Sequence, residues 1–277
     1  MVREDLVMPD ALWAIVCALL AASCAAALAP TLRVPTLLRS NFAGRDVPTA
    51  GGVCLLLAFA LTVAVAVTTN HHRYAPAPGV VLLVFGFGAL GLFDDVVGTH
   101  ASRGWRGHLA ALRRGQLSSG LVKLTGGLAL AWLVGQFVGD RMVDHVVATV
   151  IVAGSANAAN LFDLAPARST KVAVVVMAVL ALVRGGFGSG HVAVWFVVAA
   201  AALVPFEMRE QLMLGDTGAN ALGSVVGYEL LVVGSGARVA IAAAVVALNI
   251  AGELVSFSAV IDRIPPLRAL DRLGRRP

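Results

Sequence analysis

The chain has 277 residues, of which 58% are hydrophobic and only 13% are charged. A soluble domain of this size rarely carries so little charge, so the composition excludes an ordinary soluble enzyme and indicates lipid as the solvent. The net charge of +5 does not indicate nucleic acid, because the basic residues lie in short loops rather than along one face. Anionic lipid and phosphate are the partners that this charge favours. The three cysteines fall inside apolar runs and offer no disulfide framework.

Apolar runs long enough to cross a hydrocarbon core of roughly 30 Å recur along the whole chain. They predict an all-α polytopic membrane protein whose single integral membrane domain covers residues 1–277. We interpret the first run as helix one rather than a cleaved signal peptide, because it is long for a signal core and acidic residues precede it. About nine transmembrane helices are predicted, near residues 11–29, 51–69, 79–95, 121–139, 143–160, 171–184, 191–206, 217–234 and 238–257.

The lysines and arginines predict how the chain is oriented. If the loop that carries Arg33, Arg39 and Arg45 is cytoplasmic, sixteen basic residues fall on that side, among them Arg103 and Arg106. Five remain on the other side: Arg3, Arg73, Arg141, Arg184 and Arg238. This bias predicts a multi-pass protein of the plasma (inner) membrane with the amino terminus outside and the carboxyl terminus in the cytoplasm.

Carboxylates collect where predicted spans end on the cytoplasmic side. Asp94 and Asp95 end one span, where the helix dipole and their mutual repulsion disfavour two anions unless a cation lies between them or one takes up a proton. Asp163 ends another span on the same side. An isolated acidic pair is also a common way to end a helix in solvent. Several carboxylates on one membrane face favour a cation site instead.

Two asparagines lie in the span that ends at Asp163. Asn157 and Asn160 are three residues apart, so they share one side of a helix. Amides are costly in lipid, and both should face protein or a polar cleft. Two interpretations stay open: they bind a substrate, or they form hydrogen bonds between packed helices.

Asp216 opens a predicted span within Gly215-Asp216-Thr217-Gly218. It is either an N-cap or a metal ligand beside free helix amides. Hard oxygen donors without a Cys/His set suit Mg²⁺, with Mn²⁺ as the alternative, and do not suit zinc. The predicted metal ligands are Asp216, Asp95 and Asp163.

Glycines and cations supply the remaining candidates. Thr49, Gly51 and Gly52 lie in a turn that leads into a helix, where backbone amides can bind phosphate, although such a turn also serves as an ordinary helix start. Lys123 and Arg168 could clamp a pyrophosphate or act as positive-inside anchors.

As a set these segments resemble the polyprenyl-phosphate N-acetylhexosamine-1-phosphate transferases, as a shortened and divergent member. The matching segments follow one another in the family's order between Asn41 and Gly223. They are Asn41–Gly52, Gly91–Asp95, Lys123, Asn157–Asp163 and Leu214–Gly218.

The resemblance implies Mg²⁺-dependent transfer of a phospho-N-acetylhexosamine from a UDP-sugar to a polyprenyl phosphate, for cell-wall or surface-glycan synthesis, at the cytoplasmic face. Its partners would be the polyprenyl phosphate, the UDP-N-acetylhexosamine and the bilayer, with a homodimer left open. The resemblance implies catalytic roles for Asp94, Asp95 and Asp163. Substrate binding is expected from Thr49, Gly51, Gly52, Lys123, Asn157, Asn160 and Arg168.

The sequence departs from the family after Asp163. Leu164-Ala-Pro-Ala-Arg168 follows, with Pro166 where the family has a second aspartate, and no counterpart of the family's histidine-rich loop and final helix precedes Pro277. These departures favour an alternative, a non-catalytic protein that binds the lipid carrier or the UDP-sugar as an accessory or regulator. A transporter is a third hypothesis, which the lack of an internal repeat weakens.

Overall fold

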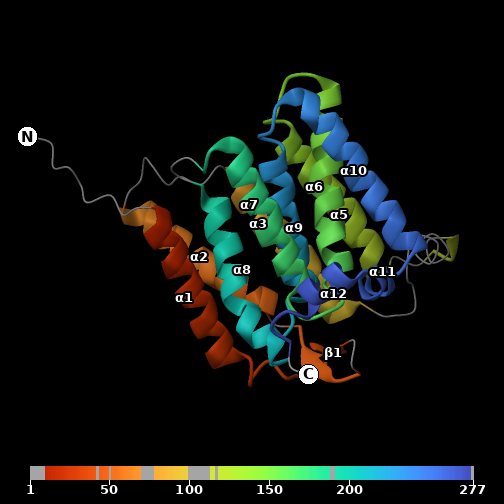
Figure 1. Cartoon of the computed structure of the whole chain (residues 1–277). Helices are drawn as coiled ribbons and strands as arrows, with labels where there is room; N and C mark the ends of the chain where they lie inside the picture. The colour runs from red at the N-terminus through yellow and green to blue at the C-terminus, as the bar shows by residue number, and fades with distance from the viewer. Residues whose placement is uncertain are drawn as a thin grey trace, which may run out of the picture.

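The computed structural model describes residues 10–41, 44–49, 51–69, 78–98, 113–115, 118–187 and 191–275. Helices dominate these ranges (Figure 1). The long helices are α1 (Asp10–Leu28), α2 (Gly51–Thr69), α3 (Pro78–Val97), α5 (Ser119–Gly135), α6 (Met142–Phe162), α7 (Arg168–Arg184), α8 (Val192–Met208), α9 (Gly215–Leu230) and α10 (Ser235–Leu254). Two short helices follow, α11 (Phe257–Arg263) and α12 (Pro265–Arg272), and two strands, β1 (Leu38–Ser40) and β2 (Asp46–Pro48), lie between α1 and α2.

Every predicted span coincides with one of these long helices, and α2 has the predicted bounds. Five helices are long and apolar enough to cross a membrane: α1, α2, α3, α6 and α10. The other four have only 16 or 17 residues. The fold is therefore that of a polytopic helical membrane protein, while nine crossings and the orientation stay predictions. Part of the charge bias cannot be placed, because Arg3, Arg73, Arg103, Arg106 and Arg276 lie outside the described residues.

Helix α9 lies in the middle of the bundle and is buried over most of its length (Figure 1). Its small residues explain this position. A Cβ added at Gly223 would meet the Ser155 carbonyl oxygen of α6 at 2.4 Å, and one at Gly227 would meet the Val152 Cα at 2.9 Å. Small residues let helix backbones approach closely in a membrane, so α6 packs directly on α9.

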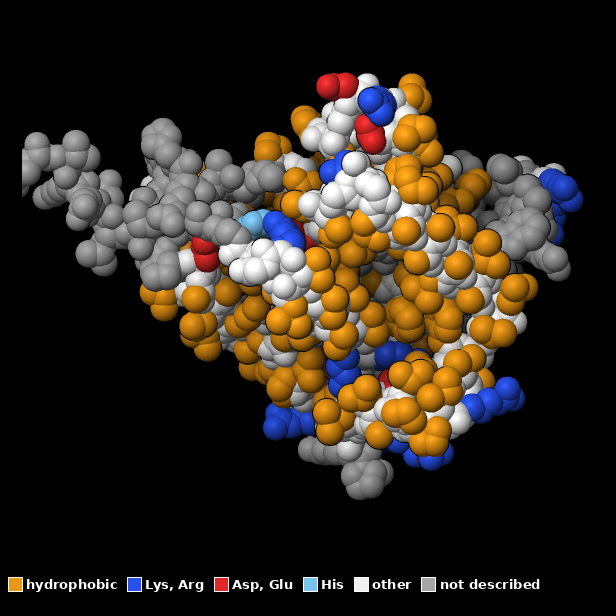
Figure 2. Space-filling model, turned by 45° about the horizontal axis from the view of Figure 1, so that its top comes forward, with side chains coloured by type: hydrophobic (Ala, Val, Ile, Leu, Met, Phe, Trp, Pro, Cys, Tyr) orange, Lys and Arg blue, Asp and Glu red, His pale blue; other side chains and the backbone are white. Residues whose placement is uncertain are grey.

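Larger side chains fill the core around α1, α2 and α8. Phe59 is fully buried and packs edge-on against Phe196, with ring centroids 5.2 Å apart. Other large apolar residues point outward, including Leu19, Leu61 and Leu182. Figure 2 shows hydrophobic side chains covering the flanks of the bundle, which is the surface expected of a protein solvated by lipid.

The hairpin of β1 and β2 and the helices α11 and α12 were not predicted. The strands pair antiparallel with Leu38 opposite Pro48, and three residues each are too few for an alternating pattern to show in the sequence. The hairpin joins the segment before α9, since the Met213 amide donates to the Pro48 carbonyl at 2.8 Å. It therefore lies at the end of the bundle where α9 begins (Figure 1).

Candidate active site

The cytoplasmic-side carboxylates of the prediction do meet in space, and a lysine lies between two of them. Lys123, near the start of α5, donates through Nζ to Asp94 Oδ2 at 2.7 Å and also to Asp216 Oδ2. All three side chains are partly accessible, with 19% of Asp94, 18% of Lys123 and 24% of Asp216 exposed. Residues 94, 123 and 216 come from three different helices, so this trio is a product of the tertiary fold.

Asp95 has a different environment from its neighbour. Its Oδ1 accepts a hydrogen bond from the Asp216 amide at 3.1 Å, and its Oδ2 accepts from the amide and hydroxyl of Thr217 at 2.9 and 2.6 Å. The carboxylate thus caps the amino terminus of α9, where free amides and the helix dipole favour an anion.

This arrangement bears on two of the predictions, the N-cap role of Asp216 and the metal-ligand role of Asp95. Asp216 is not the N-cap of α9, because that position is Leu214 and the capping carboxylate belongs to Asp95 on another helix. Asp95, predicted as a catalytic residue and metal ligand, is 6% exposed and has both oxygens engaged by α9. Its geometry supports a positioning role.

Glycines make the junction of α3 and α9 possible. A Cβ at Gly91 would lie 2.2 Å from the Asp216 carbonyl oxygen, so no other residue fits there without moving α9. Gly215 has a φ of +66°, a left-handed conformation that favours glycine, and its missing Cβ leaves room for Thr49 and Asp95. Together they hold Asp216 close to the end of α3.

The turn predicted to bind phosphate is used inside the protein instead. The amides of Gly51 and Gly52 donate to the carbonyls of Met213 and Leu214 at 2.8 and 2.9 Å. The Thr49 hydroxyl donates to the Leu37 carbonyl and is buried. Both amides are thus engaged within the protein, and phosphate binding by this turn stays a prediction. The turn positions the segment from which α9 starts.

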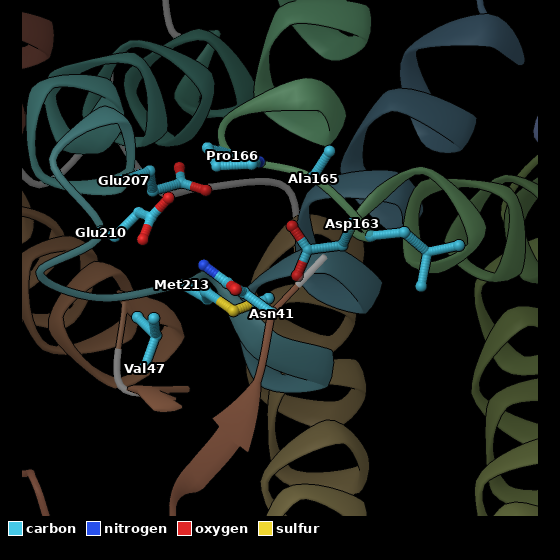
Figure 3. Close-up of a pocket in the computed structure, with 9 residues that line it drawn as sticks. Asn41, Val47, Asp163, Ala165, Pro166, Glu207, Glu210 and Met213 are labelled. Carbon is cyan, nitrogen blue, oxygen red and sulfur yellow. The ribbon is translucent and has the colours of Figure 1, made fainter. Parts of the chain in front are cut away.

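Asp163 lies behind the trio at the carboxyl end of α6 and is accessible only through a small pocket. Asn41, Glu207 and Glu210 line this pocket with it (Figure 3). Burial, followed by the negative charges of Glu207, Asp216 and Asp95, raises the pKa of Asp163 well above its ordinary value, although a hydrogen bond from the Gly215 backbone opposes this. Asp163 therefore lies close enough to Asp216 and Asp95 to be affected by their charges.

The two predicted asparagines differ in their contacts, and only Asn157 forms a hydrogen bond between helices. The Asn157 amide donates to Asn249 Oδ1 of α10 at 2.6 Å, and Asn249 in turn donates to the Gly154 carbonyl. No hydrogen bond of the Asn160 side chain is found within the described part of the chain, and its carbonyl receives the Asp163 amide. The structure gives Asn157 the interhelical role that the sequence left open.

Arg168 is also engaged away from the trio. Its guanidinium forms a two-point ion pair with Asp271 of α12, and both side chains are 7% exposed. The predicted pyrophosphate contact is not available to it in this arrangement.

Two contributors were missed in the sequence. Arg39 of β1 donates to the Asp95 carbonyl at the end of α3. Glu207 of α8 is 2% exposed and accepts from the Ala167 amide at 3.2 Å, which caps α7 because its N-cap residue Ala167 has no suitable side chain. A single acid at the end of an apolar run was the one available signal for Glu207.

The predicted Mg²⁺ site stays a prediction, and the residues that could hold the ion are Asp94 and Asp216. No group of three or more His, Cys, Asp or Glu side chains is close enough to hold a metal within the described ranges. Magnesium does not need such a group, since one or two carboxylates with substrate phosphates and water usually bind it. Asp94 and Asp216, which already have an ammonium between them, supply that donor set.

Comparisons with known proteins indicate the class of protein to which the chain is similar. No family model matches the chain. It is similar to the phospho-N-acetylmuramoyl-pentapeptide-transferase of Clostridium kluyveri, with 29% identity over 198 residues that cover 65% of this chain and 60% of that protein. The protein of the same name from Clostridium novyi is 27% identical over 198 residues, which cover 65% of this chain and 58% of the relative. The chain thus spans less than two thirds of the length of these relatives.

Proposed function

We propose that this chain transfers a phospho-N-acetylhexosamine from a UDP-sugar to a polyprenyl phosphate at the cytoplasmic face of the membrane. The observation that carries the proposal is the position of Lys123 between Asp94 and Asp216, partly exposed at one end of a membrane bundle. An ammonium between two carboxylates is suited to exchange its partners for phosphate oxygens. The names of the two clostridial relatives support a transferase of this class.

In the proposed reaction an oxygen of the lipid phosphate attacks the phosphorus next to the sugar. A new P–O–P linkage joins the lipid phosphate to the sugar phosphate, the bond between the attacked phosphorus and the bridging oxygen breaks, and UMP leaves with that oxygen and the bonding electron pair. Lys123 binds a phosphate in place of its carboxylates and offsets its charge. Asp94 then has free lone pairs to orient the lipid phosphate or accept its proton.

The metal would be held by Asp216 and Asp94, with Asp163 nearby. When bound, Mg²⁺ would shield the pyrophosphate and neutralise charge that develops on the leaving phosphate. Asp95 and Gly91 act indirectly, because they fix the start of α9 on which Asp216 lies.

The test is release of UMP by purified protein in lipid nanodiscs that contain undecaprenyl phosphate, screened with a set of UDP-N-acetylhexosamines. Asp94→Asn and Asp216→Asn should each abolish transfer of labelled sugar phosphate to the lipid. Asp262→Asn is the matched control, because Asp262 is 57% exposed on α11 and outside the trio.

The outcomes separate the hypotheses. Full transfer by either trio variant would refute the catalytic roles. Binding of a UDP-sugar without UMP release would favour the accessory protein instead. That second candidate is supported by the engagement of Arg168 with Asp271, which leaves the segment after Asp163 without a cation for the nucleotide.

A further inference from the structure

The two short helices after α10 form a separate feature at the end of the bundle that carries the trio. Helix α10 ends at Leu254, and Phe257 at the start of α11 stacks on Phe162 of α6, with ring centroids 5.0 Å apart. Helix α12 follows after Ile264. The chain therefore turns directly from an apolar helix into a helical pair beneath the bundle (Figure 1).

Contacts with α7 fix the rotation of α12 about its own axis. Arg168 Nε and Nη2 donate to the two carboxylate oxygens of Asp271 at 2.7 and 3.0 Å, and Nη1 donates to Ser258 at 2.9 Å. Lys171 donates to the carbonyls of Leu270, Asp271 and Leu273 at the end of α12. A buried two-point ion pair has strict geometry, so it fixes which side of α12 faces inward.

Apart from Asp271, the side chains of α12 are exposed, and apolar residues recur along this helix and at its two ends. Ile264, Leu267, Leu270 and Leu273 are 40%, 42%, 64% and 67% exposed. Arginines lie beside them at positions 263, 268 and 272, all exposed. Asp262 is paired with Arg272 at 3.3 Å, whereas no ion pair of Arg263 or Arg268 is found among the described residues. The surface thus combines leucines with excess positive charge.

We propose that α11 and α12 bind the anionic surface of the inner leaflet. The leucines enter the boundary between headgroups and acyl chains, and the arginines contact lipid phosphates. An amphipathic helix with arginines on its polar side binds a membrane in this way, by apolar burial and attraction to anionic lipid.

Continuity with the lipid-facing surface favours a membrane over a protein partner. Val239, Val246, Ile250 and Leu254 form an exposed apolar stripe along α10, the least buried of the five candidate spans. This stripe ends where α11 begins, and the exposed leucines of α12 follow it within the same carboxyl-terminal segment. Arg168, which was predicted to bind a pyrophosphate, would then hold α12 against α7.

Depth-dependent fluorescence quenching tests the proposal without any assay of transfer. A bimane label is placed on Leu270→Cys or Asp262→Cys in the full chain, in which Cys17, Cys24 and Cys54 are replaced by alanine. The protein is reconstituted in nanodiscs of phosphatidylglycerol with brominated acyl chains. Position 270 should be quenched about twofold or more over position 262, because both lie in this helical pair but only 270 faces the lipid. Equal quenching at the two positions would refute the proposal.

A second measurement uses the chain with its three cysteines retained. Native mass spectrometry of the wild type should show retained phosphatidylglycerol, and the combined Arg263→Gln, Arg268→Gln and Arg272→Gln variant should lose at least one bound molecule. Arg141→Gln, at the far end of α6, is the matched control and should retain the lipid. Unchanged retention in the triple variant would contradict the inference, whether or not the protein transfers a sugar phosphate.

Discussion

Replacing Asp95 by alanine distinguishes a residue that positions α9 from one that takes part in the chemistry. The substitution removes the acceptor of two amides, those of Asp216 and Thr217, and of the Thr217 hydroxyl. Asp95 is 6% exposed and Thr217 is fully buried, so water has little access to these donors. Each buried donor left without a partner costs about 1–3 kcal/mol, and the loss of three partners should therefore lower the free energy of unfolding by about 3 kcal/mol or more.

Asp94→Asn should have a much smaller effect on stability. In this variant Lys123 keeps its ion pair with Asp216, and the asparagine amide oxygen can still accept its hydrogen bond, so no charge is left without a partner. It also relieves an anion at a helix carboxyl end. We therefore expect Asp95→Ala to unfold readily while Asp94→Asn remains folded but inactive.

The assay is unfolding in mixed micelles with increasing sodium dodecyl sulfate, followed by far-ultraviolet circular dichroism. Asp95→Ala should unfold at a lower mole fraction of the detergent than the wild type, with Asp94→Asn close to the wild type. If the two variants unfold together, or Asp95→Ala is as stable as the wild type, the assignment of Asp95 as the cap of α9 is wrong.

Four further predictions follow. Lys123→Met should lower UMP release by about 100-fold or more, since a positioned group that stabilises developing charge contributes on that order; unchanged turnover would contradict it. Chelation of Mg²⁺ should stop UMP release, readdition should restore it, and Asp216→Asn should need more Mg²⁺ if it retains any activity. Gly91→Val should destabilise the protein because its Cβ would overlap α9, whereas Gly236→Ala, with open space around it, should unfold like the wild type. Burial opposes ionisation of Asp271, but Arg168 and Arg275 still hold its pKa below the ordinary value. The contact between Asp271 and Arg168 should therefore persist above about pH 4 and weaken as the pH falls through the lowered pKa. Hydrogen exchange of α12 should show this loss in acid for the wild type but not for Asp271→Asn.

Much of the helical framework was predictable because lipid enforces a simple rule. Long apolar runs must satisfy their backbone hydrogen bonds within helices, so hydropathy alone located helices such as α2 and α6 closely. The hairpin and α12 were not predicted, because three-residue strands and an eight-residue helix are too short to show a periodic pattern in the sequence.

The site was predicted in its residues better than in their roles. The face on which Asp94 and Asp216 gather could be inferred, because acids at helix ends are visible in the sequence. The partners could not, since Asp95 caps a helix more than 100 residues away and Asn157 pairs with Asn249 on α10. Hydrogen bonds between distant segments leave no local pattern, and for this reason the capping contacts of Asp95 could not be predicted.

Lys123 lies where its positive charge offsets part of the negative charge of Asp94 and Asp216. Two carboxylates at the meeting point of three helices repel each other, and the lysine, which has more rotatable bonds than either aspartate, can move its charge furthest without moving a backbone. On the proposed function, a phosphate that draws the ammonium away exposes both carboxylates at the moment when a divalent cation has phosphate oxygens to share. Lys123 thereby offsets one of the two negative charges, and the affinity of the carboxylates for a cation should depend on prior binding of the phosphate.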